Sequence, residues 1–527
     1  MPEVSFHIRW PDGAVQRCCS PSRVVETQLA PGASYPADEF LRRARAALET
    51  AAERVRERFG FACTSAAQQI DELERSALVH AFREGGDLVL VQNMEVDGVA
   101  APPPAPERLP REVGVLVVGG GQAGLSASWH LRERGVDHLV LERNRIAHEW
   151  REHRWDSFTL VTPNWQCQLP GHPYDGDDPD GFMERDQVID YVERFAEKVK
   201  PPLLEGVSVV RIGPGEDGGF EVETSIGDLH AEQVILAVAG YHRQAIPPLG
   251  GRLPEHVAQV HSADYRCPEA LPDGAVTVVG SGQSGAQIAE DLHLAGRQVH
   301  LVVGPAPRIA RFYRGRDVVA WMNDMGHYDL PITEHPMGLA ARKEANHYVT
   351  GRDGGRDIDL RRFATEGMRL HGHLLDARGP ILRFADDLAA NLDNADAVAD
   401  QAKDTIDEYI EQEGIEAPVE QRYEAAWQPD ESSAAPLDLD AAEIRSIVWA
   451  TGFRSDWSFV DLPAFDGSGY PTHERGVTSV PGLYVLGLPW LHTWGSGRFA
   501  GVARDAEHVV AHAVGRAERG GLANLAA

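Results

Sequence analysis

Two glycine-rich loops constrain the fold of this chain more than any other feature of its sequence. The first is Gly119-Gly120-Gly121-Gln122-Ala123-Gly124, and the second is Gly280-Ser281-Gly282-Gln283-Ser284-Gly285. Each follows an apolar, β-rich run and leads into a helix-compatible segment. In such a turn the first glycine permits the bend, the second lets a pyrophosphate approach, and the third allows close helix–strand packing. The helix N-terminus adds free N–H groups and positive partial charge. Each loop therefore predicts a dinucleotide site.

The residues after each loop distinguish the two dinucleotides. After the first loop, a predicted helix and strand end at Glu142, where a carboxylate can accept hydrogen bonds from a ribose diol. After the second loop, the corresponding strand ends at Gly304 without an acid, and Arg308 and Arg311 follow. Arginines in place of that carboxylate suit a 2′-phosphate. The sequence therefore predicts FAD at the first loop and NADPH at the second.

Composition narrows the class of protein. A net charge of −30 argues against nucleic acid or an anionic membrane as partner. The five cysteines show neither C-x-x-C nor metal-ligand spacing, which favours a reducing compartment and disfavours a dithiol reductase. No apolar run approaches the roughly 20 residues that span a bilayer, and no basic-then-apolar signal begins the chain. We expect a cytoplasmic protein without a membrane partner, in which the acid-dense segment 386–443 is a solvated helix face.

The chain of 527 residues is long enough for several domains. The fold class predicted is α/β, with two doubly wound, Rossmann-like dinucleotide-binding domains preceded by a small α+β domain. In that small domain we expect strands at 4–10 and 87–92 and helices at 38–59 and 66–82. The predicted divisions are the small domain (1–97), a proline-rich linker (98–112), a FAD-binding domain in two parts (113–245 and 437–527), and an NADPH-binding domain inserted between them (246–436).

Over about residues 113–527 the chain resembles the class B flavin-containing monooxygenases. Besides the glycine loops and Glu142, the matching pieces are Trp155–Leu160, Leu169–Gly171, Ala450–Phe453 and Gly482–Pro489. The family fingerprint F-x-G-x-x-x-H-x-x-x-Y is matched in its second half, by His261 and Tyr265. The resemblance implies FAD and NADPH as cofactors. It also implies O2 as a partner and oxygenation of a soft nucleophile through a flavin C4a-hydroperoxide.

Two segments carry a narrower resemblance. Residues 308–317 and 487–499 are similar to a flavin-dependent oxidoreductase family of nitrilase gene clusters. Residues 1–97 resemble a small nitrogen-starvation-response protein of the same clusters. Together they imply a fusion of two cluster members that acts in nitrogen metabolism, on an amine-like or nitrile-derived small molecule.

Candidate catalytic residues lie near the expected flavin. The resemblance implies that Asn164 hydrogen-bonds the oxygenated flavin; the alternative is a turn residue after Pro163. His492 is a candidate acid or base, or else a structural histidine. We expect no metal site. The residues predicted to bind cofactor are Gly119, Gly121, Gln122, Ala123, Gly124, Glu142, Arg143, Trp150, Gly280, Gly282, Gln283, Ser284, Gly285, Arg308, Arg311, Thr451, Gly452 and Gly487.

The predicted function is FAD- and NADPH-dependent oxygenation of a small nitrogen-containing substrate. A flavin oxidase or dehydrogenase that inserts no oxygen is one alternative, and a nucleotide-sensing protein without catalysis is another. Product mass separates the first two, because oxygenation adds an oxygen atom and dehydrogenation removes two hydrogens. Homo-oligomerisation stays open.

Overall fold

The computed structural model describes residues 4–11, 15–20, 23–59, 69–70, 73, 76–77, 88–96, 99–100 and 109–525. The chain forms two compact units, residues 1–106 and 107–527. Within the described residues, no helix combines the length and the apolar character needed to cross a membrane.

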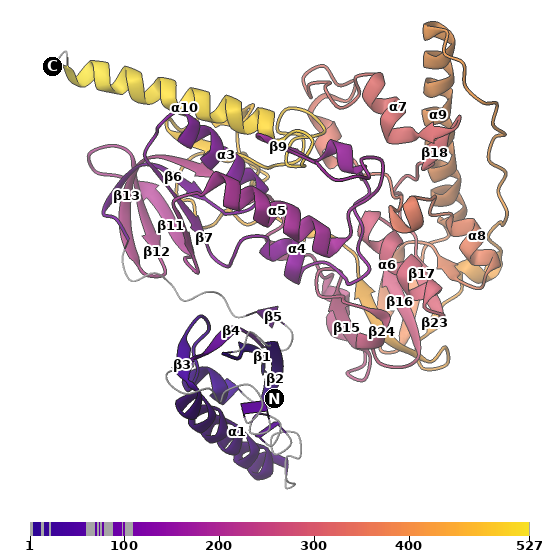
Figure 1. The fold of residues 1–527 in the computed structure, drawn as a ribbon. Coiled ribbons are helices and arrows are strands. Elements are labelled where there is room, and N and C mark those ends of the chain that lie inside the picture. The colour runs from indigo at the N-terminus through magenta and orange to yellow at the C-terminus, as the bar shows by residue number, and fades with distance from the viewer. Residues whose placement is uncertain are drawn as a thin grey trace. The chain divides into compact units, whose positions relative to one another are not determined.

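The N-terminal unit is an antiparallel sheet of order β2-β1-β4-β3 with helix α1 packed against it (Figure 1). Alternate residues of β1, Val4, Phe6 and Ile8, are buried in one core with Phe40 and Leu48 of α1. This confirms the predicted α+β domain. The elements are β1 (Val4–Arg9), β2 (Val15–Ser20), η1 (Arg23–Thr27), β3 (Ser34–Pro36), α1 (Ala37–Phe59), β4 (Leu88–Val96) and β5 (Val99–Ala100).

The N-terminal unit extends beyond the boundary predicted at residue 97. Strand β5 pairs with β4, so residues 99–100 belong to the domain and the linker predicted at 98–112 begins later. Most of the helix predicted at 66–82 lies outside the described residues; the described ones, 69–70, 73 and 76–77, are helical.

Parallel strands form the sheet that carries the first glycine loop. Its order is β10-β7-β6-β13-β28, with the short antiparallel strands β27 and β26 at one edge. Along β6, Val115 and Val117 face the helices α3, α5 and α10, while Leu116 and Val118 face the opposite core. Burial on both faces explains the unbroken apolar run that precedes the glycines. The strands are β6 (Glu112–Val118), β7 (His138–Glu142), β10 (Leu203–Glu205), β13 (Gly227–Leu236), β26 (His473–Glu474), β27 (Val477–Thr478) and β28 (Leu483–Val485).

The second glycine loop lies on a separate, wholly parallel sheet of order β15-β24-β16-β17-β20. Val276 and Val278 of β16 pack with helix α6, and Ala275 and Val279 face the opposite side. Two doubly wound sheets therefore confirm the predicted fold class. The strands are β15 (Ala258–His261), β16 (Ala275–Val279), β17 (Val299–Val302), β20 (Arg369–His371) and β24 (Ile444–Trp449).

The return to the first domain was predicted too early. The boundary at residue 437 assigned the following strand to the FAD-binding domain, but β24 pairs on both sides with β15 and β16 of the second sheet. Strand β23 (Leu437–Asp438) also pairs with β22 of the inserted region. The chain crosses back only after Trp449, where β14 (Arg243–Gln244) pairs with β25 (Phe453–Arg454).

Further elements surround the two sheets. The helices are α3 (Gln122–Glu133), α4 (His148–Glu152), α5 (Arg185–Val199), α6 (Gln283–Leu294), α7 (Val318–Asp324), α8 (Leu360–Thr365), α9 (Leu388–Glu413) and α10 (Val502–Leu525). The remaining strands are β8 (Gln168–Leu169), β9 (His172–Pro173), β11 (Val209–Pro214), β12 (Phe220–Thr224), β18 (Phe312–Tyr313), β19 (Arg316–Asp317), β21 (Leu374–Arg378) and β22 (Ile381–Phe384).

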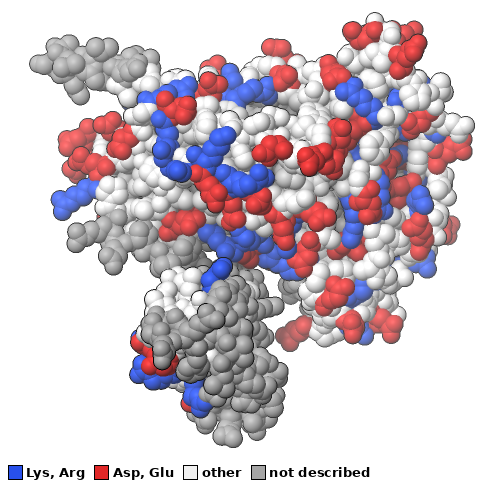
Figure 2. Space-filling view, viewed as in Figure 1, with Lys and Arg blue, Asp and Glu red and all other residues white. Residues whose placement is uncertain are grey.

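Helix α9 occupies the first part of the acid-dense segment 386–443, and residues 414–443 contain no α-helix. Leu388, Leu392, Ala395 and Ala399 recur at helical spacing on its buried side, while most acidic side chains stay exposed. Acidic residues gather at the upper right of Figure 2, where Figure 1 places this helix. The prediction of a solvated helix face is therefore confirmed for α9 and is wrong for residues 414–443.

Candidate functional site

The first glycine loop has the geometry of a phosphate cradle. Gly119 turns with φ +106°, and α3 begins after Gly121 with no side chain capping its N-terminal N–H groups. A Cβ at Gly124 would lie 1.8 Å from the carbonyl oxygen of Gly119, so helix and turn can touch only through a glycine. A Cβ at Gly121 would meet no atom within 4 Å. The chain leaves that space open, where a pyrophosphate would approach the free N–H groups.

The second loop repeats this construction. Gly280 turns with φ +106°, and α6 begins after Gly282, again without a side-chain cap. A Cβ at Gly285 would lie 1.8 Å from the Gly280 carbonyl oxygen, and one at Gly282 would meet open space. Ser284 is exposed on the first turn of α6. The chain therefore fits two dinucleotides, one on each sheet.

Glu142 ties the first loop to the end of β7. One of its carboxylate oxygens accepts a hydrogen bond from the Gly120 N–H at 2.7 Å, and the other accepts from the Asn144 N–H at 2.9 Å. Burial raises the pKa of this carboxyl, and the two N–H donors oppose that shift. Each oxygen keeps a free lone pair, so the ribose role stays compatible with the geometry and stays a prediction.

The glutamine after the second glycine does the same in both loops: it holds a distant segment over the cradle. Gln122 donates from Nε2 to the Gly497 carbonyl at 3.0 Å. Gln283 donates from Nε2 to the Val349 carbonyl at 2.6 Å, and its Oε1 accepts from the Val349 N–H at 3.3 Å. We call these two side chains the glutamine clamps. Through them, each cradle is covered by a loop from a remote part of the chain.

Other predicted cofactor residues surround the first cradle. Trp150 on α4 donates to Gln122 Oε1 at 3.4 Å and stacks on Phe499, with ring centroids 5.6 Å apart. Ala123 is buried at the start of α3, and a Cβ at Gly487 would lie 2.8 Å from its Cβ. Arg143 is exposed and lies 3.6 Å from Glu149. The contact with Gln122 places Trp150 against the glycine loop, and the contact with Ala123 places Gly487 there.

Thr451 and Gly452 lie where the chain crosses between the sheets. The Thr451 hydroxyl donates to the Ala245 carbonyl at 2.8 Å, and the Ala245 N–H donates to Gly452 at 3.0 Å. His261 Nε2 also donates to the Gly452 carbonyl, at 2.9 Å, while its Nδ1 accepts from the Ala263 N–H at 3.2 Å. These partners require the neutral Nε2–H tautomer, and burial lowers the pKa of this histidine accordingly.

Tyr265, the other fingerprint residue, joins the two sheets through a buried carboxylate. Asp291 on α6 accepts from the Tyr265 hydroxyl at 2.7 Å and from the Ser157 hydroxyl at 2.6 Å. Arg352 adds a third hydrogen bond at 3.0 Å. Ser157 belongs to the first domain and Asp291 to the inserted one, so this cluster fixes one against the other. Both matched fingerprint residues thus act at the crossing.

Asn164 makes structural hydrogen bonds. Its Nδ2 donates to the Asp178 carbonyl at 2.9 Å, and its Oδ1 accepts from the Met183 N–H at 2.7 Å. The side chain is buried and fastens the segment 178–183 to the turn η2 (Asn164–Gln166). One N–H of the amide remains, so the turn role is present and the catalytic role stays a prediction.

His492 is held in place through its backbone. Its backbone is anchored by Ser496 Oγ at 3.0 Å and by the Ile332 N–H at 2.7 Å. Burial lowers the pKa of its ring, and the positive charges of Arg475 and Arg504 add to that shift. In the described part of the chain no hydrogen bond joins the ring to Asn164, and the role of His492 as an acid or base stays a prediction.

Arg308 and Arg311 are buried and paired with carboxylates, whereas the sequence suggested accessible guanidinium groups. Arg308 is 3% exposed and donates to Asp396 at 2.6 Å. Arg311 is fully buried, donates to the Val161 carbonyl at 2.8 Å and pairs with Asp317 at 3.3 Å. A 2′-phosphate would have to displace these buried partners, which is strongly unfavourable. The burial and pairing of both arginines therefore argue against either as the phosphate ligand.

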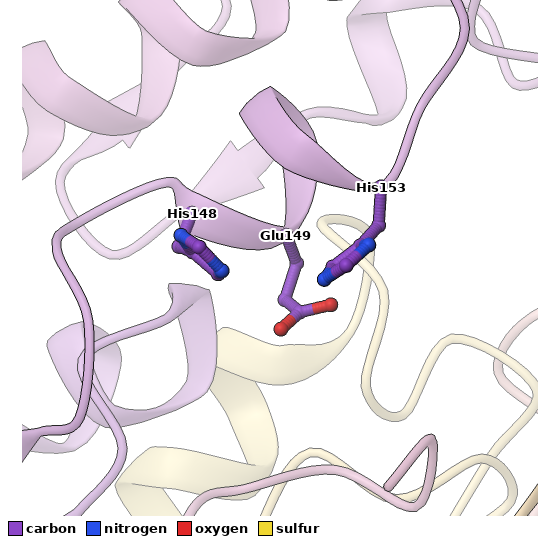
Figure 3. Close-up of side chains that lie close together, drawn as sticks. All are labelled: His148, Glu149 and His153. Atoms are coloured by element: carbon purple, nitrogen blue, oxygen red, sulfur yellow. The ribbon is translucent and has the colours of Figure 1, made fainter. Parts of the chain in front are cut away.

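A possible metal cluster was not visible in the sequence. The ligand atoms of His148, Glu149 and His153 lie within 4.8 Å of one another, with the carboxylate between the two rings (Figure 3). Burial lowers the pKa of His148 to about 4, which keeps it neutral as a ligand must be. A cation would, however, have to compete with Arg143 for Glu149. The absence of a metal stays a prediction.

Sequence reasoning missed the residues that cover the cradles and join the domains. Gly497 and Val349 bind the clamps through backbone atoms, which leave no trace in residue type. Asp291 resembles any acid on an amphipathic helix until its partners are known. The two glycines at 495 and 497 were a sequence signal that this loop packs closely against another part of the chain. In the structure, a Cβ at Gly497 would lie 2.6 Å from the Gly487 carbonyl oxygen.

Two dinucleotide cradles on two parallel sheets define a flavin-dependent, pyridine-nucleotide-dependent oxidoreductase. Residues 116–321 match the pyridine nucleotide-disulphide oxidoreductase family, and residues 5–94 match the nitrogen starvation-induced protein NitG family. These matches confirm the predicted flavin-dependent oxidoreductase region and the resemblance of the N-terminal residues to a nitrogen-starvation protein, whereas the link to nitrilase gene clusters stays a prediction. FAD and NADPH are the cofactors of this class, and the cradles fit them.

More particularly, the chain belongs to the CzcO-like oxidoreductases. It is 31% identical over 402 residues to the uncharacterised CzcO-like oxidoreductase of Geobacillus kaustophilus, covering 76% of this chain and 97% of that protein. It is 29% identical to the indole-3-pyruvate monooxygenase YUCCA6 of Arabidopsis thaliana over 215 residues, 39% of this chain and 51% of that protein. The solved flavin-containing monooxygenase from Stenotrophomonas maltophilia shares the fold, with a TM-score of 0.53 and 20% identity over 77% of this chain and 99% of that one.

Proposed function

We propose that this protein is an FAD- and NADPH-dependent monooxygenase that oxygenates a small nitrogen-containing, amine- or nitrile-related molecule. The observation that carries the proposal is the pair of covered cradles within residues 107–527, one for the flavin and one for its reductant. In the balanced reaction NADPH supplies two electrons. One oxygen atom of O2 enters the substrate, and the other leaves as water.

The flavin would supply electron transfer and oxygen activation, by the C4a-hydroperoxide route that the family resemblance implies. The chain's own residues bind and shield it. The N-termini of α3 and α6 hold the two pyrophosphates, Glu142 takes the ribose, and the glutamine clamps keep their loops over the cofactors. The free N–H of Asn164 is the group proposed to face the flavin.

The NitG-family match of residues 5–94 supports a nitrogen-containing substrate, because a nitrogen-starvation protein fused to an oxidoreductase couples their expression. A cytoplasmic location is part of the same proposal and rests on cysteine usage. Cell fractionation with an antibody to the chain tests the location directly.

An isotope experiment tests the activity. The purified yellow protein is incubated with NADPH and a metabolite extract of nitrogen-starved bacteria under ¹⁸O2, and products are sought by mass spectrometry. A product with one ¹⁸O atom supports the monooxygenase. A product that has lost two hydrogens without the label shows an oxidase or dehydrogenase instead. Bound nucleotide without any NADPH-dependent product would leave the sensing alternative.

A further inference from the structure

We infer that His148, Glu149 and His153 bind one Zn²⁺ or a similar divalent transition-metal ion, which joins the two ends of helix α4. The inference goes beyond the proposed oxygenation and departs from the sequence-based prediction of no metal. One ligand atom of each residue lies within 4.8 Å of the others. In Figure 3 the Glu149 carboxylate lies between the two imidazole rings, and all three side chains point to the same side of the helix.

The ligand atoms of this cluster have few other partners. Among the described residues, the His148 ring makes an edge contact with the His153 ring, with centroids 5.6 Å apart, and no hydrogen bond. His153 Nδ1 lies 3.4 Å from the Ala263 carbonyl oxygen. In the tautomer that donates there, Nε2 keeps its lone pair for a cation. A histidine held through its other nitrogen by a carbonyl is typical of metal ligands.

The donor set selects the class of ion. Two imidazole nitrogens and one carboxylate oxygen suit Zn²⁺ and similar transition metals, whereas Mg²⁺ and Ca²⁺ prefer oxygen ligands alone. Zn²⁺ binds such atoms at roughly 2.0–2.2 Å, so ligands of one ion lie about 3–4 Å apart. Small side-chain rotations within the 4.8 Å cluster would therefore close it around the ion, and water would complete the coordination.

The arginines around the cluster do not prevent cation binding. Arg143 lies 3.6 Å from Glu149, longer than a hydrogen bond, and both side chains are exposed. Because an exposed pair of this kind is weak, a bound cation would displace Arg143 into solvent. Arg145 is paired with Glu152 at 3.1 Å. Arg154 lies over the Trp150 ring, with its guanidinium carbon 5.0 Å from the ring centroid.

A metal at this position would act on the first cradle through α4. The helix is only five residues long, which is too short to be stable by itself. The ion would join His148, its first residue, to His153, the residue after its last. Between them lies Trp150, which donates to Gln122 at 3.4 Å. The bound metal would therefore hold Trp150 against the clamp that covers the flavin.

Zinc binding to the untagged, FAD-loaded full chain tests the inference. The protein is freed of metal with a chelator, then equilibrated with Zn²⁺ in excess Mg²⁺, which occupies surface carboxylates. Bound zinc is measured by mass spectrometry. We expect the wild type to bind one Zn²⁺ per chain more than His153→Gln, and Glu149→Gln to bind it at least tenfold more weakly. Cysteines are the same in all these proteins, so any zinc that they bind cancels in the comparison.

His230→Gln is the matched control. His230 Nδ1 lies 3.1 Å from Glu221, so this pair offers an imidazole and a carboxylate, but it belongs to no described cluster of three ligands. This variant should bind as much zinc as the wild type. Flavin content and melting temperature show whether each variant is folded. If His153→Gln does not fold, Glu149→Gln keeps the test, because its side chain is exposed.

Equal zinc binding by the wild type, His153→Gln and Glu149→Gln, or no binding by any of them, would overturn the site. Flavin fluorescence tests its effect: saturating Zn²⁺ should slow the release of FAD in denaturant from the wild type and not from Glu149→Gln. The same release rate with and without Zn²⁺ would overturn the link to the first cradle. These measurements use neither NADPH nor O2, so their failure leaves the ¹⁸O result untouched.

Discussion

Gly121 and Gly124 stand three residues apart in one turn but have opposite surroundings. The space next to Gly121 is open, whereas a Cβ at Gly124 would collide with the Gly119 carbonyl at 1.8 Å. Gly121→Val should therefore fold normally and lose FAD, because its side chain fills the pyrophosphate space. Gly124→Ala should lose both flavin and thermal stability. Flavin absorbance per protein and the melting temperature of each variant check this.

Gly282→Val provides the matched control for Gly121→Val. Gly282 has the same open space at the second cradle. This variant should retain FAD at the wild-type level and show a raised KM for NADPH. A Gly121→Val protein that keeps its full flavin content would refute the assignment of the first cradle.

Asn164 combines a structural role with its proposed catalytic one, and two substitutions separate them. Asn164→Ala removes the bonds to Asp178 and Met183 and should lower stability by about 1–3 kcal/mol. Asn164→Asp keeps the acceptor for Met183 and should cost less. In both variants, NADPH oxidation should release more hydrogen peroxide and less product, because the amide N–H is missing. Peroxide and product yields unchanged from wild type would reduce Asn164 to a turn residue.

At the scale of elements, β17 and β20 meet through a buried histidine pair. His300 Nδ1 lies 3.0 Å from His371 Nε2, the rings stack, and burial lowers the pKa of each to about 4. Unfolding restores the ordinary pKa of about 6.5, so the unfolded state binds more protons between these values. The free energy of unfolding therefore has its full value above about pH 6.5. It decreases as the pH falls towards 4, by roughly 2 kcal/mol per histidine between pH 7 and pH 5.

Denaturant midpoints measured between pH 7.5 and pH 5 check this dependence. His371→Gln should weaken the slope with pH. His256→Gln, on the exposed surface, should leave it as in the wild type. A wild-type slope that persists in His371→Gln would assign the acid sensitivity to other groups.

The elements best predicted from sequence were those with local signals. The strand expected to end at Glu142 is β7, and the strand expected to end at Gly304 is β17. Both were found because each follows a helix signal and a glycine, Gly135 or Gly296. Strand β24 was found but assigned to the wrong domain, since an apolar parallel strand does not reveal which sheet it joins. The antiparallel strands β11 and β12 were missed, because short strands with alternating charges resemble surface loops.

At the scale of the whole molecule, the unit 107–527 contains both cradles, both clamps and the proposed metal site. A truncated chain beginning at Glu107 should therefore fold, remain yellow and oxidise NADPH. Gel filtration, flavin absorbance and NADPH consumption compare it with the full chain. Precipitation without flavin would show that residues 1–106 are part of the oxidoreductase core.

The candidate site was predicted where residue type carries the chemistry. Glycines with fixed spacing and an acid at a strand end predict a phosphate cradle and a ribose partner without any tertiary knowledge. The arginines failed, because charge alone does not show that Arg308 is already paired with Asp396. His148, Glu149 and His153 were not considered as ligands, since their convergence is visible only once α4 has formed.

The clamp between Gln122 and Gly497 spans 375 residues of sequence. A nascent chain emerges N-terminus first, so the loop that covers the first cradle leaves the ribosome 375 residues after Gln122. Until then the cradle has its glycines and its helix but no cover. Flavin loading is therefore completed only after Gly497 has been synthesised, and a chain interrupted before that residue leaves an open cradle that cannot be closed.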